Sequence, residues 1–401
     1  MLSARHTTRG VAQSTRLRRG FFVTIYIMAF LWAAGIAFPE YVWSSFIENF
    51  VPEHTVGLYF AVANFVALVG VLTFAHVLRR FGNYRVIMAV TVLSVVMPLL
   101  LVYAHGPWSV LLYFALYWLF VELLLISLDV LLENISDDGH TGRIRSFYLT
   151  AQNLGWLVAM VGMGVLADRA DNFNSILIIG SALLVGIIVI LLVHRKKFRD
   201  YRDYKSRTPL QLISVLHKRK NLRNGLWLSF ALQFFYAIMV LYMPIYLHQY
   251  IGLSFQTIGI IFATMLFAFI VIEAPAGVIA DRFLGEKEMM IAGVLLMSAS
   301  TLAIFVLDTR SVVVWIAVLF ATRVGAALLE AMQEIYFFKQ ISRKDSDLIN
   351  VFRDFRSLAW LIASAAGSLV LIFLPIGYIF VFLGFLLLLA IIPASRLHDT
   401  R

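Results

Sequence analysis

The sequence predicts an all-α membrane protein with twelve transmembrane helices in two pseudo-symmetric six-helix bundles. Of its 401 residues, 61% are hydrophobic and only 14% are charged, and the mean hydropathy is +0.86. This composition excludes an ordinary soluble protein. The apolar residues fall into separate stretches, and several features recur about half a chain later. The stretches predict spans, and the recurrence predicts two related halves.

A helix needs about 20 apolar residues to cross a ~30 Å hydrocarbon core. Twelve stretches meet this requirement, six in each half. They cover residues 21–45, 55–78, 84–104, 108–131, 147–167, 174–193, 225–248, 254–280, 288–307, 311–337, 357–374 and 376–394.

Basic residues predict the orientation, because Lys and Arg are retained on the cytoplasmic side. With the amino terminus placed there, the same side holds 30 of the 33 Lys and Arg residues. We therefore expect a multi-pass protein of the cytoplasmic (inner) membrane with both termini cytoplasmic. The net charge of +10 is explained by this membrane surface, so no nucleic-acid partner is expected. No cleavable signal peptide is visible, and the chain has no cysteine for disulfides or thiolate metal sites.

Polar interruptions set the expected domain boundaries. Residues 1–20 form a cytoplasmic segment, 21–194 and 225–396 the two bundles, and 397–401 a cytoplasmic tail. The linker 195–224 is strongly basic, and its second part carries an apolar stripe ahead of a basic patch. That part is either an interfacial helix on anionic lipid or a solvated linker.

An internal repeat relates the fourth and tenth spans. Three pairs of residues have the same separation of 201 positions: Glu122 and Arg323 (323−122), Asp129 and Glu330 (330−129), and Glu133 and Glu334 (334−133). In each helix the spacings of seven and four residues keep the three side chains on roughly one face. An ionised side chain within a span normally faces a protein interior or a water-filled cavity. Parallel repeats of this kind place a binding site near the bilayer midplane between the halves.

The loop between the eighth and ninth spans reads Gly277-Val-Ile-Ala-Asp281-Arg282-Phe-Leu-Gly-Glu-Lys287. It resembles the cytoplasmic loop signature of the major facilitator superfamily of secondary transporters. The first copy, residues 75–85, lacks the Gly and the Asp, and the fifth span lacks the Gly-Pro signature of the family's antiporters. The resemblance in overall plan covers nearly the whole chain and identifies no subfamily. It implies that Gly277, Asp281 and Arg282 take part in a cytoplasmic latch.

In this superfamily the first, fourth, seventh and tenth helices line a central cavity. The resemblance therefore implies that Glu122 and Arg323 face one space from opposite halves. Our hypothesis is that they form an ion pair, or share an anionic substrate, and that this contact is coupled to alternation. The alternative is a structural salt bridge that fixes packing between the halves, although a buried pair stabilises poorly compared with apolar packing.

Further acids suggest a gate and a coupling site. Asp129 and Glu330 lie towards the cytoplasmic ends of their helices, where they could pair with basic residues such as Arg145 and Arg353, or be ordinary solvated helix ends. Glu273 lies inside the eighth span, where desolvation favours a neutral carboxyl that can carry a proton, or a structural hydrogen bond. Glu40 is expected nearer the outer surface, where it could be merely an interfacial group.

The remaining candidates are polar or aromatic residues that could line the cavity or simply pack the core. They are Gln233, Tyr236, Trp32 and Trp118. No phosphate loop, zinc-protease motif or nucleophile elbow is present in the sequence, so neither an enzyme nor a cofactor or metal is expected.

These features predict a secondary active transporter, working as a symporter or antiporter, that moves a small solute by alternating access. Coupling to protons or another cation is expected from the acids at membrane depth, and the expected partners are the solute, that cation and membrane lipid. The protein is expected to be a monomer. The alternative is a non-transporting membrane sensor or scaffold on the same fold.

Overall fold

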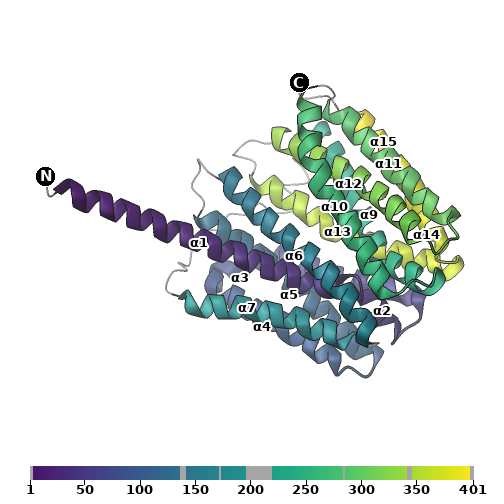
Figure 1. Cartoon of the computed structure of the whole chain (residues 1–401), viewed down its shortest axis with the longest axis horizontal. Helices are drawn as coiled ribbons and strands as arrows, with labels where there is room; N and C mark the ends of the chain where they lie inside the picture. Colours follow the sequence, from purple (N-terminus) through teal and green to yellow (C-terminus); the bar gives the residue numbers. More distant parts are fainter. Residues whose placement is uncertain are drawn as a thin grey trace.

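A computed structural model describes residues 3–135, 141–170, 173–195, 219–282, 285–340 and 346–397. Within these ranges, some helical residues are described by their backbone alone. Most of the basic linker 195–224 lies outside the described residues, so its predicted interfacial helix stays a prediction. Figure 1 shows the path of the chain.

Six long helices form the first bundle. They are α1 (Ser3–Glu40), α3 (Glu53–Phe81), α4 (Asn83–Val102), α5 (Pro107–Ile135), α6 (Thr141–Ala170) and α7 (Asn174–Val193). The second bundle contains α9 (Lys220–Ile245), α10 (Phe255–Arg282), α11 (Glu286–Val306), α12 (Val312–Gln340), α13 (Ser346–Phe373) and α14 (Gly377–Leu389), with the short α15 (Ile391–Ser395) after it. The prediction of twelve helices in an all-α membrane fold is confirmed. Over the described residues, ten of them are long and apolar enough to cross a membrane.

Successive long helices alternate in direction, which defines two ends of the molecule. The end reached near residues 22, 81, 193, 220, 340 and 397 is called the termini end, and the end near residues 48, 103, 173, 250, 309 and 375 is called the far end. Turns between helices are short. At the termini end α3 passes into α4 through Gly82 alone, whose φ of 80° is a left-handed conformation that suits glycine.

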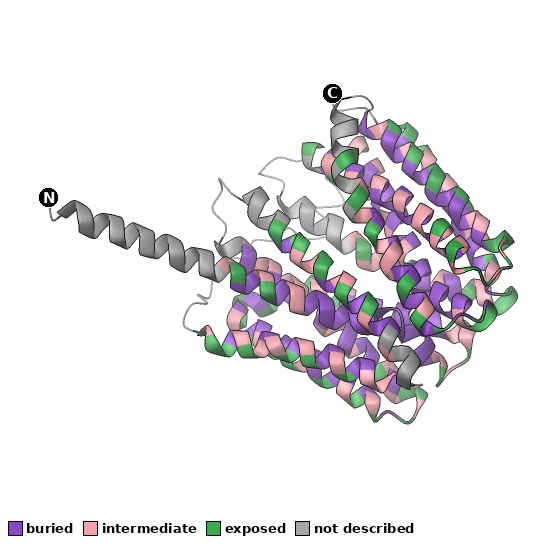
Figure 2. Cartoon of the chain, in the orientation of Figure 1, coloured by how far each residue is buried: buried purple, intermediate pink, exposed green. Residues whose placement is uncertain are grey.

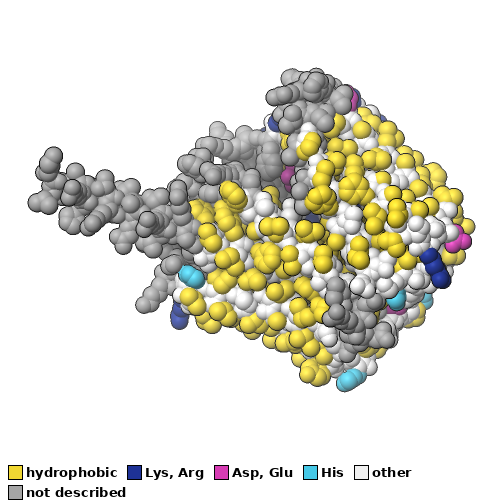
Figure 3. Space-filling view, in the orientation of Figure 1, with side chains coloured by type: hydrophobic (Ala, Val, Ile, Leu, Met, Phe, Trp, Pro, Cys, Tyr) yellow, Lys and Arg dark blue, Asp and Glu magenta, His cyan; other side chains and the backbone are white. Residues whose placement is uncertain are grey.

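Burial follows the expected pattern of a helical membrane bundle. Buried residues line the helix faces that meet inside the molecule, and exposed residues lie on the outward faces (Figure 2). The outward faces are themselves apolar. Hydrophobic side chains are spread over both bundles on the visible face in Figure 3, and charged groups lie near its edges and beside the space between the bundles. An apolar outer surface of this extent is typical of a protein that contacts lipid.

The first span of each bundle is broken near the far end, at a proline that cannot donate a backbone hydrogen bond. Pro39 lies in the last turn of α1, and after two turn residues the chain continues as the short α2 (Trp43–Glu48). In the second bundle Pro244 lies in the last turn of α9, and the chain continues as the π-helix η2 (Tyr246–Tyr250). In the sequence, Pro39-Glu40-Tyr41 parallels Pro244-Ile245-Tyr246, and this parallel extends to a shared structural feature.

Candidate functional site

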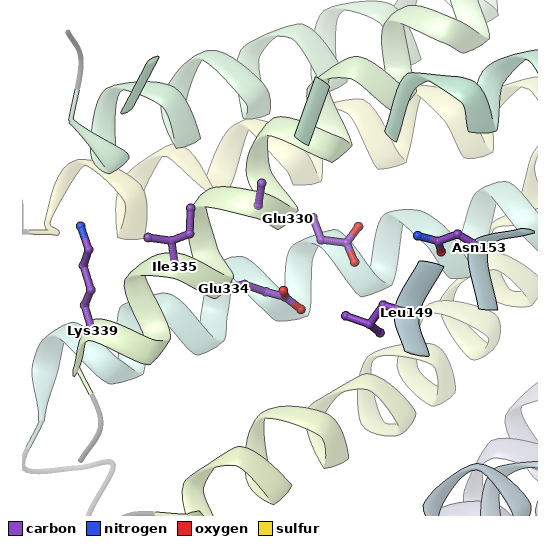
Figure 4. Close-up of a pocket in the computed structure, with 7 residues that line it drawn as sticks. Leu149, Asn153, Glu330, Glu334, Ile335 and Lys339 are labelled. Carbon is purple, nitrogen blue, oxygen red and sulfur yellow. The ribbon is translucent and has the colours of Figure 1, made fainter. Parts of the chain in front are cut away.

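A cavity of about 670 Å³ lies between the two bundles. One wall is α6, through Leu149 and Asn153, and the other is α12, from Glu330 to Lys339. In Figure 4 the carboxylates of Glu330 and Glu334 point towards the α6 wall. Because α12 runs from the far end to the termini end, these residues place the cavity in the half of the molecule nearer the termini.

The far end is closed by helices of opposite bundles that touch through glycines. A Cβ on Gly259 of α10 would lie 2.5 Å from Cα of Gly164 of α6, so neither position can carry a side chain in this packing. Tyr242 of α9 fills the space between α3 and α13 in the same way. A Cβ on Gly57 or Gly367 would lie within 2.3 Å of an atom of this ring. Small residues allow helices in membranes to approach this closely.

Two hydrogen bonds between the bundles border this contact. The side-chain amide of Gln249 donates to Glu48 at 2.7 Å, and the hydroxyl of Tyr250 donates to Glu53 at 2.8 Å. Burial raises the pKa of the Glu48 carboxyl, and the hydrogen bond from Gln249 partly offsets that rise. We call this pair of bonds the far-end latch. Over the described residues, the bundles are thus separated by a cavity towards the termini end and in close contact at the far end.

Arg323 is buried to 2% exposure in the interior of α12. Its guanidinium lies over the ring of Tyr236 at 5.2 Å and over that of Phe235 at 5.5 Å, both on α9. These are favourable cation–π contacts, but they leave the in-plane N–H donors unused. Among the described residues, Nε and Nη2 of Arg323 have no hydrogen-bond acceptor. Buried, unsatisfied donors of a charged group are costly, which makes this position a candidate for a ligand that supplies acceptors.

Tyr236 joins Arg323 to the cavity. Its ring supports the guanidinium, and its hydroxyl donates to a carboxylate oxygen of Glu330 at 2.6 Å. Arg323 and Glu330 are seven residues apart on one helix, about 10 Å along its axis. The site thus presents a cation at its inner limit and carboxylates along the wall that leads to the termini end.

An aromatic contact crosses between the bundles beside this site. The rings of Trp118 and Trp360 are 5.9 Å apart, and the guanidinium of Arg356 lies 5.9 Å from the Trp360 ring. Trp360 donates to Gln233 at 3.3 Å, and Trp118 donates to Asn64 at 3.2 Å.

Glu122 and Arg323 do not form an ion pair in this conformation: within the described residues the carboxylate of Glu122 has no hydrogen bond or ion pair. The hypothesis that they share a substrate or pair in another state stays a prediction.

Trp32 donates to the backbone oxygen of Val121 at 3.2 Å, so its polar atom holds two helices of the first bundle together. Asp129 is on the same helix as Glu122, near the termini end.

Several predicted site residues cannot be placed by their side chains. Those that lie outside the described side chains are Glu273, Gly277, Asp281, Arg282, Arg145 and Arg353. The predicted gate and latch on the termini side therefore stay predictions.

Glu40 differs from the expectation of an interfacial position. It is only 8% exposed, and α2, which follows it, is itself buried from Trp43 to Ile47. It lies within electrostatic range of Glu122 and of Arg356. Its place at the proline break was visible in the sequence as Pro39-Glu40, but the extra buried helix after the break was not.

The comparisons with known proteins agree with this architecture. The sequence profile of the Major Facilitator Superfamily matches residues 20–263 and 243–400. No curated protein matches the sequence. Among solved structures, a variant of the nucleoside transporter NupG superposes with a TM-score of 0.75 at 13% identity, over 93% of this chain and 98% of that one.

A bacterial homologue of the human lysosomal transporter Spinster, in an inward-facing and unoccupied conformation, superposes with a TM-score of 0.71 at 14% identity. It covers 94% of this chain and 97% of that one. At these identities the neighbours show the fold alone. The family match spans nearly the whole chain, and the two bundles, their break positions and the cavity between them are consistent with it. The chain belongs to the major facilitator superfamily.

Proposed function

We propose that the protein is a secondary active transporter of the cytoplasmic membrane that moves a small solute by alternating access. The observation that carries this proposal is the position of Arg323: a buried guanidinium, with donors that meet no acceptor among the described residues, between a sealed far end and the cavity towards the termini. A scaffold has little use for such a group, since burying a charge without partners is costly. A site exposed to one side at a time needs this arrangement.

With both termini in the cytoplasm, as the basic residues predict, the structure corresponds to an inward-open state. The solute would enter the cavity past Glu330 and reach Arg323 with its acceptor groups. A guanidinium presents donors in a planar fork, which fits a carboxylate, a phosphate or a comparable pair of oxygens. The substrate class that follows is a small solute with an anionic group, and the carboxylates of the cavity wall favour a donor or cationic group at its other end.

The first test is a thermal-stabilisation screen of the purified protein with small carboxylates, phosphates and zwitterions. A compound that binds the folded state raises its melting temperature. We expect Arg323→Gln to weaken binding of any such compound by roughly 10- to 100-fold, since a hydrogen bond to a charged group contributes about 1.5–3 kcal/mol. Arg323→Lys should not restore it, because an ammonium lacks the planar fork. Arg310→Gln, at the far end, is the matched control.

Transport then separates a carrier from a sensor. A compound found in this way should be taken up by proteoliposomes that contain the wild-type protein, and uptake should be lost with Arg323→Gln. Equal binding by wild type and Arg323→Gln would contradict the site. Arg323-dependent binding with no flux would instead identify a non-transporting sensor on this fold.

A further inference from the structure

A second charged position lies at the break of the first span, and the proposed substrate site does not use it. Glu40 is the last residue of α1, directly after Pro39, and is only 8% exposed. Among the described residues, its carboxyl group has no hydrogen-bond or ion-pair partner. A mostly buried carboxyl is costly to keep ionised without partners, so the fold itself does not account for it.

The repeat gives an internal control for this residue. The equivalent break in the second bundle reads Pro244-Ile245-Tyr246, and Ile245 is fully buried. An apolar side chain therefore fits this break in one half of the molecule. The carboxyl at Glu40 is thus not a requirement of the broken helix, and its role must lie in its charge or its proton.

The groups around Glu40 define what it can bind. Glu122 and Tyr117 of α5 lie within electrostatic range, as does Arg356 of α13, and the neighbouring Tyr41 lies within range of Arg323 of α12. Helix α7, packed against α1, has no titratable side chain from Asn174 to Val193. On α6, Asp168 and Arg169 lie outside the described side chains.

Glu40 therefore has an acid of its own bundle, Glu122, and a basic residue of the other bundle, Arg356, within electrostatic range. Two ionised carboxyls in a poorly solvated site disfavour each other. A guanidinium that approaches or withdraws changes this preference. Because Arg356 and Arg323 belong to the second bundle, any rocking of the bundles changes the field at Glu40 and Glu122.

We propose that Glu40 is the coupling site of the transporter, where one proton is bound and released as the bundles move, with Glu122 as its acidic neighbour. This inference rests on the proposed function, and it assigns to Glu40 a role that the sequence had offered for Glu273 as one of two alternatives. The helix break supports it, because the carbonyl end of α1 carries a partial negative charge that favours a proton or cation nearby. The substrate at Arg323 and the proton at Glu40 would be separate occupants of one inter-bundle space.

The test uses protons as the only ligand and a distance across the far end as the readout. The chain has no cysteine, so Tyr103→Cys with Val313→Cys gives a unique spin-label pair, one in each bundle, at positions 75% exposed. The distance between the two spin labels is measured by double electron–electron resonance in lipid nanodiscs from about pH 5 to about pH 9, a range over which a perturbed carboxyl titrates. We expect the ratio of short to long distances to change severalfold across this range.

Glu40→Gln, which keeps the shape and removes the proton, should abolish most of this change, and Glu122→Gln should reduce it. Asp308→Asn, an exposed acid at the same end, should leave it unaltered. A distance ratio that is independent of pH in the labelled parent, or that changes equally in Glu40→Gln, would overturn the proposal. Glu40→Asp, which retains a titrating group, should restore part of the change and so excludes a merely structural effect.

These outcomes are separate from the test of the substrate site. If Arg323 binds its compound but Glu40→Gln keeps the full pH response, the coupling assignment fails and the proposed transport function stands. If Glu40 controls the pH response but no compound depends on Arg323, the substrate site fails instead.

Discussion

The two bundles are packed tightly against each other at the far end and are separated by a cavity at the termini end. At the far end backbone meets backbone at Gly164 and Gly259, Tyr242 fills the remaining space, and two side-chain hydrogen bonds lie outside it. At the termini end α6 and α12 are separated by a cavity lined with carboxylates. Close packing has one well-defined geometry, whereas a polar cavity tolerates many. From this difference we infer that packing at the far end determines the conformational state, whereas the cavity at the termini end is available to solutes.

The largest predicted effect comes from forcing the far end apart. Leu at Gly259 cannot be accommodated against the backbone of α6, and overpacking of this kind typically costs about 1–3 kcal/mol, here in the sealed state alone. Gly259→Leu should therefore reduce the ratio of sealed to open molecules by roughly 5- to 150-fold and should strongly impair transport. The far-end spin-label distance measures this directly.

A matched control exists in the second bundle. Gly225 also lies in a long helix, but a Cβ there would meet no atom within 4 Å. Gly225→Leu should leave both the distance and the transport rate close to wild type. Equal behaviour of the two variants would show that the glycine contact does not control the seal.

A smaller effect is expected from the far-end latch. Glu48→Ala with Glu53→Ala removes both hydrogen bonds between the bundles, each worth about 0.5–1.5 kcal/mol net. Because both bonds are exposed to solvent, we take the low end of this range, about 1 kcal/mol for the pair, so the ratio of sealed to open molecules should fall by roughly 5-fold. This is less than expected for Gly259→Leu, because the glycine contact remains. The same label pair reports it, with Asp308→Ala as the control. An unchanged distance distribution would show that the two hydrogen bonds of the far-end latch do not stabilise the sealed state.

Tyr236→Phe sharpens the comparison at the open end. The ring that supports Arg323 is kept, while the hydroxyl that donates to Glu330 is lost. We expect a compound bound through Arg323 to lose affinity by about 3- to 10-fold, in line with one hydrogen bond, and the far-end distance to stay unchanged. Titration calorimetry or the melting-temperature shift measures the affinity, with Tyr378→Phe as a surface control. A shifted far-end distance would mean that the two ends are not as separate as their structures indicate.

The smallest effect concerns pH at the latch. Because burial raises the pKa of Glu48 in the sealed state, that state binds a proton more tightly than a state in which the carboxyl is solvated. The sealed state should thus gain stability as the pH falls through the raised pKa towards the ordinary value of about 4.3, and the gain should be absent at higher pH. Since Glu48 is partly exposed, we expect a change well below tenfold. Glu48→Gln should remove it, and a response of opposite sign would contradict the assignment.

Much of the architecture could be predicted because membrane helices are long and strongly apolar. The expected span 174–193 agrees with α7, and 288–307 differs from α11 by two residues at its start and one at its end. The site was predicted less completely. Arg323 stood out because a charge in an apolar helix is conspicuous, but its contact with Phe235 depends on how two helices are rotated, which spacing alone does not fix.

The burial of Glu40 could not be predicted from the sequence. Its depth depends on whether the chain leaves the bundle after Pro39 or turns and continues, and Trp43–Ile47 are compatible with either course. Only packing against α3 and α9 settles it. The pair Glu122 and Arg323 shows a related limit: a repeat places two residues at equivalent positions, whereas the distance between them depends on the conformational state.

The central claim is that the two ends open and close in opposition around Arg323. A single set of measurements tests it: the far-end pair Tyr103→Cys with Val313→Cys, and a termini-end pair Val193→Cys with Leu389→Cys, each recorded with and without Gly259→Leu. The account predicts that Gly259→Leu lengthens the far-end distance and shortens the termini-end distance. A termini-end distance that stays fixed, or lengthens as well, would contradict alternating access in this protein.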